Sequence, residues 1–557
     1  MHSLIKKIRA NPQIKQFSQM WQHDVVAGLS VAVVTIPQSL AYAQLVGLPP
    51  VYGLYASLLP TLIAGLTASS PYIATGPTAI ISLLTASVIA SPGLLSLSTV
   101  IVIAATLALM VGLLQILFGL IKLGLLIRYI ARPVVIGFMN AAAIIIAVSQ
   151  FRVLFGVAPS DGFHFFRELA SIIFYIDDIN PYTAVFGLFS LVTLYAGKRY
   201  LPAVPWVLFV VVITIIVSYT TGFQGAVVGV IPTGFPRIGL SFIDPSLFSL
   251  LLVPAILIAF MGCIEGVTVA KSVSGRNSRI RPNNEMISQG YANIAAALSG
   301  TLPVAGSYSR TALTASTGAR SRLTAVVVVL SVLAALFFAS SFLRFLPKAT
   351  LAAIIIVVVS RLIKLSVLRE LIHDYPRDAV VAGATFVASF LFAPNLAYAV
   401  LVGVLVSILM LLYRNANPPS QVLYLDIPES YAAADLHFDD YPSNAHVAVV
   451  VWDGSITFVN AGAFEDVLLS TLSHEPKVSH VIILGRGINE IDTTGQETIE
   501  SVYEQLKRSR ITLVFSRLRN TPVKRLQESG LYNKIGSEYF FKRANDALAS
   551  INQGKKT

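Results

Sequence analysis

Two short polar stretches interrupt the apolar part of this sequence: PVAGSYSRTA at residues 303–312 and PYIATGPTA at residues 71–79. Each places proline and glycine ahead of hydroxyl-bearing residues, and each opens an apolar run shorter than the ~20 residues of a full membrane crossing. Paired interrupted helices of this kind mark the substrate site of many secondary transporters. The alternative is that proline and glycine only kink packed helices. The hydroxyls and Arg310 coincide with the break, which favours a site.

The two stretches belong to a longer repeat. The separation of Thr78 from Thr311 along the chain nearly equals the separation of Gln38 from Glu265, two polar residues that each lie within an apolar run. This common offset predicts two repeats of seven membrane elements each. Helix N-termini inside a membrane present unpaired N–H groups and a partial positive charge, so the predicted ligand is an anion.

Composition supports a membrane protein. Of 557 residues, 55% are hydrophobic and 12% are charged, and the mean hydropathy is +0.73. A soluble chain carries about 25% charged residues, so a disordered protein is excluded and an ordinary soluble enzyme is disfavoured. The single cysteine, Cys263, excludes a disulfide framework. No HExxH, CxxC or P-loop motif occurs, so no enzymatic activity, metal site or cofactor is expected.

Apolar segments predict about fourteen membrane elements, several of them short. Their centres lie near Val34, Leu59, Ile80, Leu107, Ala141, Phe186, Val210, Leu257, Asn293, Ala312, Val329, Ile356, Phe386 and Leu405.

The charge distribution predicts orientation and domain organisation. Up to Ser420 the basic residues exceed the acidic ones by 15, and after it the acidic residues exceed by 3. With the N-terminus inside, inner segments hold twenty basic residues and outer segments five, so both termini are predicted to be cytoplasmic in a multi-pass protein of the cell membrane. No basic stripe on a soluble face suggests nucleic acid, and no signal peptide is expected. The predicted parts are a cytoplasmic segment (1–24), a transport domain (25–414), a linker with a first strand (415–444) and a small α/β domain (445–557).

Arg310 is the central candidate for anion binding. An arginine inside a membrane requires a partner or water, and its planar guanidinium suits an oxyanion. Ser307 and Ser309 lie beside it in the sequence. The alternatives are a salt bridge to Glu265 and extension of the side chain to the inner membrane surface.

Glu265 is the candidate for coupling, because it is predicted to be the only carboxylate deep inside a span. Burial favours its protonated form. An ionised carboxylate repels a nearby anion, so protonation promotes anion binding, which is the physical basis of proton symport. A structural partnership with Arg310 is the alternative. Sodium coupling through Glu265 and Thr268 ranks lower, because hard cations prefer more anionic oxygen.

Two further segments contribute candidate ligands. Gln38 and Tyr42 stand at i and i+4 and so share one helix face. Gln38 can donate to and accept from an oxyanion, or it can form an interhelical hydrogen bond instead. Thr75 and Gly76 are expected to offer backbone N–H groups at a broken helix.

The tail shows a different periodicity. Residues 446–452, 480–484 and 511–515 are predicted strands, and residues 461–472, 498–508 and 522–529 are predicted helices. This alternation predicts a small α/β domain.

Several motifs resemble the SulP (sulfate permease) family of anion transporters. They are IPQSLAYA at 36–43, GLPP at 47–50, GLYAS at 53–57, Gly76-Pro77, Asn293 and GSYSRTA at 306–312. The tail resembles a STAS domain.

This resemblance implies a seven-plus-seven inverted repeat with two half-helices, like that of uracil permease, with core and gate subdomains, an elevator-like motion and a homodimer. The anion would lie between the N-terminal ends of the third and tenth elements. The implied substrate-binding set is Gln38, Tyr42, Ala74, Thr75, Gly76, Ser307, Tyr308, Ser309 and Arg310.

The sequence DTTG at 492–495 resembles the DSSG loop of STAS domains, whose first hydroxyl residue is phosphorylated in stand-alone regulators. Thr493 matches that position, although helix capping by Asp492 and Thr493 is the favoured interpretation. Gly485-Arg486 stands where relatives often have an acidic residue, which argues against regulation by phosphorylation or nucleotide. The domain is therefore expected to act in dimerisation or trafficking, or to bind a regulatory protein.

The leading hypothesis is proton-coupled sulfate uptake. Bicarbonate, a C4-dicarboxylate, and an exchanger or channel without proton coupling are alternatives. A membrane-anchored scaffold acting through its tail is an alternative of another class.

Overall fold

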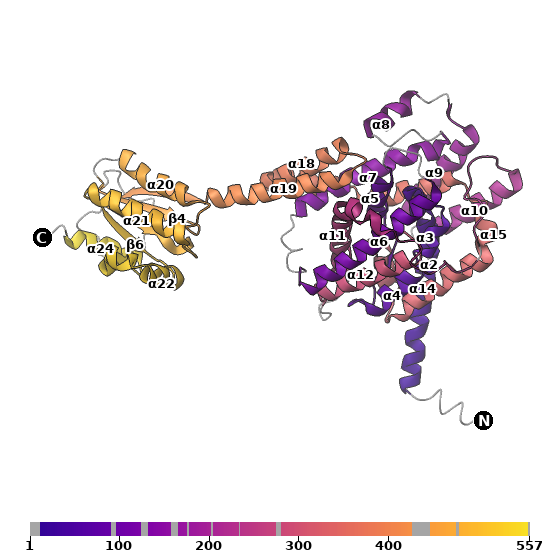
Figure 1. The fold of residues 1–557 in the computed structure, drawn as a ribbon, viewed down its shortest axis with the longest axis horizontal. Coiled ribbons are helices and arrows are strands. Elements are labelled where there is room, and N and C mark those ends of the chain that lie inside the picture. The colour runs from indigo at the N-terminus through magenta and orange to yellow at the C-terminus, as the bar shows by residue number, and fades with distance from the viewer. Residues whose placement is uncertain are drawn as a thin grey trace. The chain divides into compact units, whose positions relative to one another are not determined.

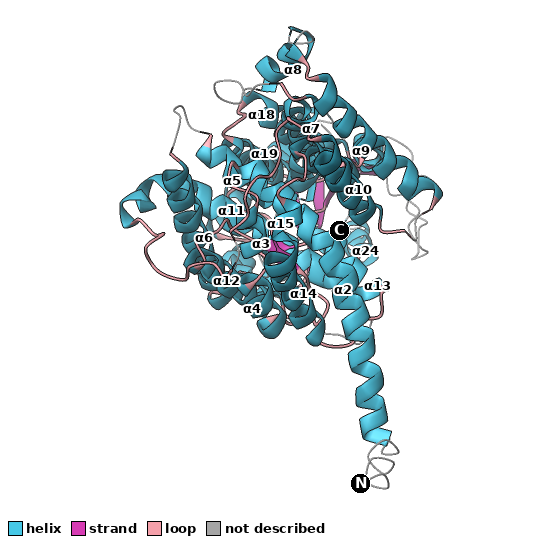
Figure 2. Ribbon diagram, turned by 90° about the vertical axis from the view of Figure 1, so that its right-hand side faces the viewer, coloured by secondary structure: helices cyan, strands magenta, loops and turns pink. Residues whose placement is uncertain are grey.

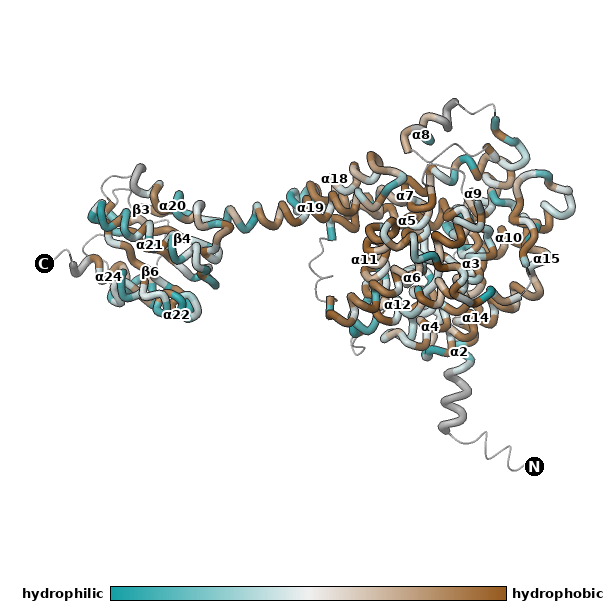
Figure 3. Tube along the Cα trace, viewed as in Figure 1, coloured by the Kyte–Doolittle hydropathy of each residue, from teal (hydrophilic) through white to brown (hydrophobic). Residues whose placement is uncertain are grey.

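The computed structural model divides the chain into two compact units, residues 1–407 and 408–557 (Figure 1). It describes residues 12–90, 96–123, 132–157, 165–174, 178–201, 204–232, 234–273, 280–425, 446–474 and 478–554. Helices predominate in the N-terminal unit (Figure 2), and its tube is mostly brown in the hydropathy colouring, whereas the C-terminal unit is mixed (Figure 3).

The helices of the first repeat follow one another with short connections. They are α2 (Pro12–Val46), α3 (Val51–Tyr55), α4 (Leu59–Thr67), α5 (Ala79–Ile89), α6 (Leu97–Leu120), α7 (Arg132–Phe155), α8 (Phe165–Phe174), α9 (Pro181–Tyr200) and α10 (Trp206–Thr221).

The second repeat begins after the short turn η3 (Pro245–Leu247). Its helices are α11 (Phe248–Ser272), α12 (Pro282–Leu298), α13 (Tyr308–Ser316), α14 (Leu323–Ala334), the π-helical turn η4 (Ala335–Ala339), α15 (Ser340–Leu343), α16 (Lys348–Val359), α17 (Leu365–Asp374), α18 (Pro376–Leu391) and α19 (Leu396–Ala416). A 3₁₀ turn, η5 (Ser360–Leu362), links α16 to α17.

All fourteen predicted element centres fall inside these helices. A backbone inside a membrane must satisfy its own hydrogen bonds, so each apolar run folds as a helix. Seven helical segments among the described residues are long and apolar enough to cross a bilayer. No predicted element covers α8 or α17, whose polar and apolar residues recur at helical spacing and do not form an apolar run.

Close backbone approach joins α6 and α12. A Cβ built on Gly112 would lie 2.8 Å from the carbonyl oxygen of Gly290, and one built on Gly290 would lie 2.7 Å from that of Gly112. Small residues allow such contact, which is a principal means of packing helices in membranes. One buried cluster continues from α2 through α6 and α12 to Leu302 and Val304, so this packing also supports the chain that leads into α13.

The C-terminal unit contains a five-stranded sheet of order β3-β4-β5-β6-β7. The strands are β3 (Ser420–Leu425), β4 (Val447–Trp452), β5 (His480–Leu484), β6 (Thr512–Ser516) and β7 (Phe540–Phe541). β3 pairs antiparallel with β4, and the remaining pairs are parallel.

Helices cover both faces of this sheet. Alternate strand residues such as Val450, Ile483 and Phe515 pack with α20 (Ala461–His474), α21 (Thr493–Arg508), α22 (Asn520–Glu528) and α23 (Leu531–Ile535). The intervening residues, such as Val449, Ile482 and Val514, pack with α24 (Ala544–Gly554). The structure contains the predicted strands and helices of the tail. The predicted strands are apolar on both faces, as a parallel sheet covered by helices on both sides requires.

Candidate functional site

The two half-helices α5 and α13 meet through a short antiparallel strand pair. β1 (Thr75–Gly76) pairs with β2 (Ala305–Gly306), with Thr75 opposite Gly306 and Gly76 opposite Ala305. The Ser307 N–H donates to the Ala74 carbonyl at 2.9 Å, and the Ala74 N–H donates to the Thr311 hydroxyl at 2.9 Å. Segments from the two repeats are thus fixed to each other directly before both helices begin.

The helix starts lie slightly later than expected. α5 begins at Ala79 with Thr78 as its N-cap, and α13 begins at Tyr308 with Ser307 as its N-cap. Neither N-cap side chain accepts from a backbone N–H of its helix, so the first-turn N–H groups have no capping side chain. The expectation that Thr75 and Gly76 supply helix-terminal N–H groups is wrong, because both residues belong to the strand pair. The groups at the helix ends come from Ala79 onward and from Tyr308 onward.

Arg310 is held in the first turn of α13, and its side chain is only 1% exposed. One terminal nitrogen donates to the Pro77 carbonyl at 2.7 Å, while Nε has no hydrogen-bond partner among the described residues. A Cβ built on Gly76 would lie 3.1 Å from the guanidinium, so glycine permits this approach. The guanidinium therefore bridges from the second repeat to the chain that enters α5.

Glu265 lies on α11 and is 5% exposed. Its Oε2 accepts from the Thr78 hydroxyl at 3.1 Å. The alternative that pairs it with Arg310 is not found, because no ion pair joins the two side chains in the part of the chain that the structure describes. The carboxylate instead contacts the N-cap of the first half-helix.

Glu265 is not the only buried carboxylate of this unit, although no other is placed deep inside a predicted span. Asp24 on α2 and Glu285 on α12 are at most 1% exposed. Asp24 accepts from the Arg320 and Ser321 N–H groups, and Glu285 accepts from the Ser69 N–H and hydroxyl. Both lie near span ends, where sequence reading assigns a solvated flank, and tertiary packing buries them.

Gln38 and Tyr42 are buried on α2, which packs against both half-helices. Tyr42 stands one turn after Gln38 on the same face of this helix. The Gln38 Oε1 atom is buried and has no partner among the described residues, so the predicted interhelical hydrogen bond through this oxygen is not seen.

Ser307, Tyr308 and Ser309 lie on the more open side of the same turn. Tyr308 and Ser309 are exposed and Ser307 is half-buried, and the two serine hydroxyls are 3.5 Å apart. The structure therefore brings the strand pair, Glu265 and Arg310 together at the two helix ends, and it packs α2, which carries Gln38 and Tyr42, against both half-helices.

A supporting layer lies behind the strand pair; of its residues, the sequence motifs had singled out only Asn293, with no role assigned. The Gln289 amide donates to the Thr75 hydroxyl at 2.9 Å, and the Thr61 hydroxyl donates to the Thr75 carbonyl at 2.7 Å. Asn293 donates to the Val304 carbonyl and accepts from its N–H, and it also donates to Gln115 on α6. The sequence does carry a signal for this layer: the amide residues Gln289 and Asn293 stand at i and i+4 in a helix whose neighbouring residues are mostly small.

In the tail, Thr493 is the exposed first residue of α21. Asp492 caps this helix by accepting from the Gly495 N–H at 2.8 Å, as the capping interpretation predicts. No group of three or more His, Cys, Asp or Glu residues suited to a metal occurs among the described residues.

Comparison with known proteins decides the family. Residues 21–385 match the sulfate permease family, and residues 440–547 match the STAS domain. The chain belongs to the sulfate permease family.

Relatives match over nearly the whole chain. A probable sulfate transporter of Mycobacterium tuberculosis is 32% identical over 538 residues, covering 95% of each chain. The sodium-independent sulfate anion transporter of Bos taurus is 31% identical over 459 residues, covering 74% of this chain and 73% of the relative.

Solved structures support the fold. The murine Slc26a9 anion transporter in the inward-facing state matches with a TM-score of 0.86 at 21% identity, covering 96% of this chain and 91% of that one. The membrane domain of the cyanobacterial bicarbonate transporter BicA matches with a TM-score of 0.60 at 24% identity, covering 70% and 97%. The sulfate permease fold of this chain thus agrees with the predicted seven-plus-seven arrangement and half-helices, and the STAS domain with the predicted tail.

Proposed function

We propose that this protein is a secondary active transporter that imports a small oxyanion, sulfate first, together with protons. The observation that carries the proposal is the meeting of two uncapped half-helices at a strand pair that holds the buried guanidinium of Arg310. The family match and the sulfate transporters among its relatives support the same substrate class.

The electrostatics of this arrangement suit a dianion. Each half-helix contributes roughly half a positive charge at its N-terminus, and Arg310 adds a full one. Arg310 also retains an unpaired Nε–H donor. Gln38 offers an amide N–H donor on α2, which packs against both half-helices. Donors from α2 and α13 can therefore surround an oxyanion between the helix ends, with Tyr42, Ser307, Tyr308 and Ser309 at its edge.

Glu265 provides the coupling. Its carboxylate contacts Thr78, the N-cap of α5, so it lies beside one of the two positive helix ends. Ionised, it lowers the local potential and repels the anion; protonated, it leaves the two helix ends and Arg310 unopposed. Sodium coupling would use the same carboxylate with Thr268, and it is the alternative that the experiment tests.

The remaining parts of the proposal concern the whole protein. The protein resides in the cell membrane with both termini in the cytoplasm, acts as a homodimer, and moves the half-helices with their core against the other helices in an elevator-like transition. Thr493 is accessible to a regulator at the helix start of the STAS domain.

Radiolabelled sulfate uptake into proteoliposomes with an imposed inward proton gradient tests the proposal. Accumulation that collapses when the gradient is dissipated supports proton-coupled sulfate transport, and replacement of the proton gradient by a sodium gradient tests the other cation. Bicarbonate, fumarate and chloride serve as competitors in turn. Entry of a competitor in place of sulfate overturns the substrate assignment, and the absence of any anion flux overturns transport itself and favours the scaffold.

A further inference from the structure

The carboxyl ends of the parallel strands β4 to β7 form one edge of the STAS sheet, the carboxyl rim. Five exposed basic residues follow those strand ends: Arg486, Arg517, Arg519, Lys542 and Arg543. Three exposed acidic residues lie among them: Asp453, Glu490 and Asp546. The helices α20, α21, α22 and α24 also begin at this rim, and their N-terminal ends add partial positive charge.

The last turns of α19, from residue 408, belong to the same compact unit as the STAS sheet and end at this rim. The Asn460 amide donates to the Asn415 carbonyl at 3.1 Å, and the Asp453 N–H donates to the Pro419 carbonyl at 3.1 Å. Ser420, the first residue of β3, pairs with Trp452 at the carboxyl end of β4. The helix therefore delivers the chain to the carboxyl rim and not to the opposite edge.

α19 is long and apolar enough to cross a bilayer, and most of its span is exposed and so available to lipid. Three residues, 417–419, separate its end from β3, and three residues extend at most ~10 Å. That reach is comparable with the Debye length of about 8 Å at physiological ionic strength, within which a charged surface attracts basic residues. For a bilayer that α19 crosses up to its last turn, the start of the rim would therefore lie within electrostatic range of the membrane surface.

An exposed aromatic residue lies at the same rim. Phe458 is 74% exposed, between β4 and α20. Its N–H donates to the Asp492 carboxylate at 2.8 Å, and the neighbouring Thr457 N–H donates to Asn460 at 2.9 Å, so the backbone that carries the ring is fixed. Phenylalanine is among the apolar side chains that surface-bound segments bury at the boundary between headgroups and acyl chains.

We propose that the carboxyl rim of the STAS domain binds the anionic phospholipid headgroups of the leaflet at which α19 ends, with Phe458 entering the headgroup layer. Charge alone does not select this rim, because the opposite edge carries Lys507, Arg508 and Arg510. Continuity with α19 and the exposed ring select it. The inference requires that α19 crosses the membrane, and it is independent of which anion is transported.

The test uses the full-length protein in nanodiscs of phosphatidylcholine, alone or mixed with phosphatidylglycerol. A cysteine at Asn489, an exposed residue of the rim, carries an environment-sensitive fluorophore after the single native cysteine is replaced by C263A. Lipids with a nitroxide on the headgroup report contact by quenching. We expect quenching that requires phosphatidylglycerol and weakens with salt, whereas a reporter at Ser509, on the opposite edge, remains unquenched.

Two matched double variants identify the charges. K542Q/R543Q removes two exposed basic residues from the rim and is expected to weaken the phosphatidylglycerol-dependent association roughly tenfold or more. K507Q/R508Q removes the same charge from the opposite edge and is expected to leave it unchanged. F458S is expected to reduce quenching in the same lipid.

Three outcomes overturn the proposal. Equal quenching of the reporters at Asn489 and Ser509 would show that both edges approach the lipid through non-specific attraction of basic residues. Equal effects of the two double variants would show the same. A rim reporter that is unquenched by lipid yet shielded from an aqueous quencher assigns the rim to a protein surface such as a second copy of the chain. Transport assays on each variant serve as the check that the protein remains folded.

Discussion

Two arginines of the membrane unit have different kinds of partner. Arg152 pairs with the Glu168 carboxylate at 2.6 Å, as a poorly hydrated guanidinium normally requires. Arg310 is more deeply buried, yet its one hydrogen-bond acceptor among the described residues is the Pro77 carbonyl. A buried cation that lacks a carboxylate partner is best explained by a ligand that brings the negative charge.

Removal of the Arg310 charge is therefore expected to abolish sulfate transport. R310K retains the charge but cannot both bond to Pro77 and present a planar pair of donors, so sulfate affinity should fall by about tenfold or more, since a charged hydrogen bond contributes about 1.5–3 kcal/mol. Calorimetric titration of sulfate into the purified protein measures this. Unchanged affinity in R310A would remove the residue from the site.

Substitution of Glu265 should separate binding from coupling. E265Q imitates the protonated side chain, so sulfate counterflow should persist while accumulation driven by a proton gradient is lost. E285Q is the matched control, because Glu285 is also buried but accepts from Ser69 and not from the N-cap residue Thr78. If E265Q still accumulates sulfate against a gradient, coupling resides elsewhere.

At the scale of helices, the contact of α6 with α12 positions the site. Gly112 and Gly290 allow the two backbones to touch, and Asn293, less than one turn after Gly290, holds the chain that enters β2. Helix spacing and the placement of α13 are thus set by the same face of α12.

A methyl group on this face should be costly. In G290A the new Cβ would lie 2.6 Å from Ile116 and 2.7 Å from the Gly112 carbonyl, so we expect a loss of about 1–3 kcal/mol of stability, visible as a lower Tm in detergent. G383A on α18 is the control, since nothing lies within 4 Å of its built Cβ. Equal Tm values for the two variants would contradict the proposed contact.

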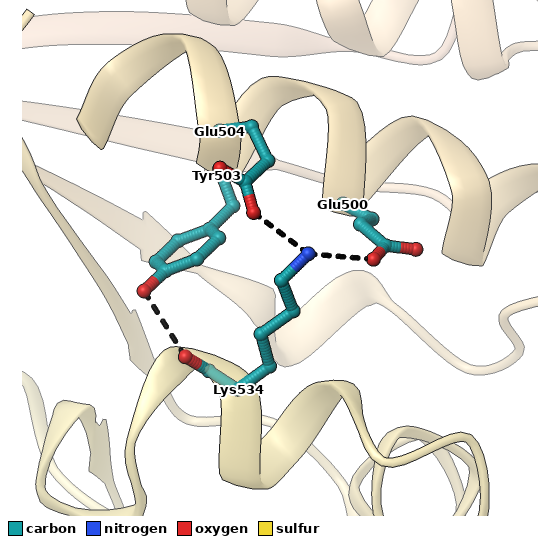
Figure 4. Close-up of polar contacts among 4 residues, drawn as sticks. All are labelled: Glu500, Tyr503, Glu504 and Lys534. Carbon is teal, nitrogen blue, oxygen red and sulfur yellow. Dashed lines mark hydrogen bonds and ion pairs between the residues drawn. The ribbon is translucent and has the colours of Figure 1, made fainter. Parts of the chain in front are cut away.

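At the scale of the whole molecule, the two compact units are stabilised by different forces. The membrane unit relies on close packing and buried hydrogen bonds, whereas the STAS domain also uses exposed ion pairs. Lys534 contacts Glu500 and Glu504 at 2.7 Å each, and the Tyr503 hydroxyl donates to the Lys534 carbonyl (Figure 4). Hydrogen bonding to Lys534 holds the pKa of Glu504 below its ordinary value, and the two glutamates raise the pKa of Lys534.

These shifts set a pH window for the STAS domain. The Glu504 contribution is present above its ordinary pKa of 4.5 and is lost as pH falls through the lowered value. The Lys534 contribution is present below its ordinary pKa of 10.5 and is lost only as pH rises through the raised value.

Wild type should therefore exceed K534Q in stability between these limits, and the difference should vanish in acid. Trp452, buried beneath α20, reports unfolding of this domain in a W21F/W206F background. K524Q, which removes a longer 3.8 Å pair with Glu528, should change little. A difference between wild type and K534Q that is the same at acid and neutral pH would exclude the ion pairs as its cause.

Local sequence was sufficient to predict the membrane class, all fourteen helix positions, the two half-helices and the α/β tail. These features depend on composition and periodicity: an apolar run in lipid must be helical, and the two runs that follow proline and glycine at 71–79 and 303–312 are too short to cross a bilayer. The motifs around Gln38 and Arg310 likewise indicated the family before any contact was known.

The contacts of those residues came from tertiary packing. That Arg310 bonds to Pro77 rather than to Glu265, that Thr75 and Gly76 form a strand instead of a helix end, and that Glu285 is buried against Ser69 all depend on segments of one repeat meeting segments of the other. Sequence periodicity shows which face of a helix is polar, but the partner of that face is fixed by how the repeats pack together, and no local pattern encodes it.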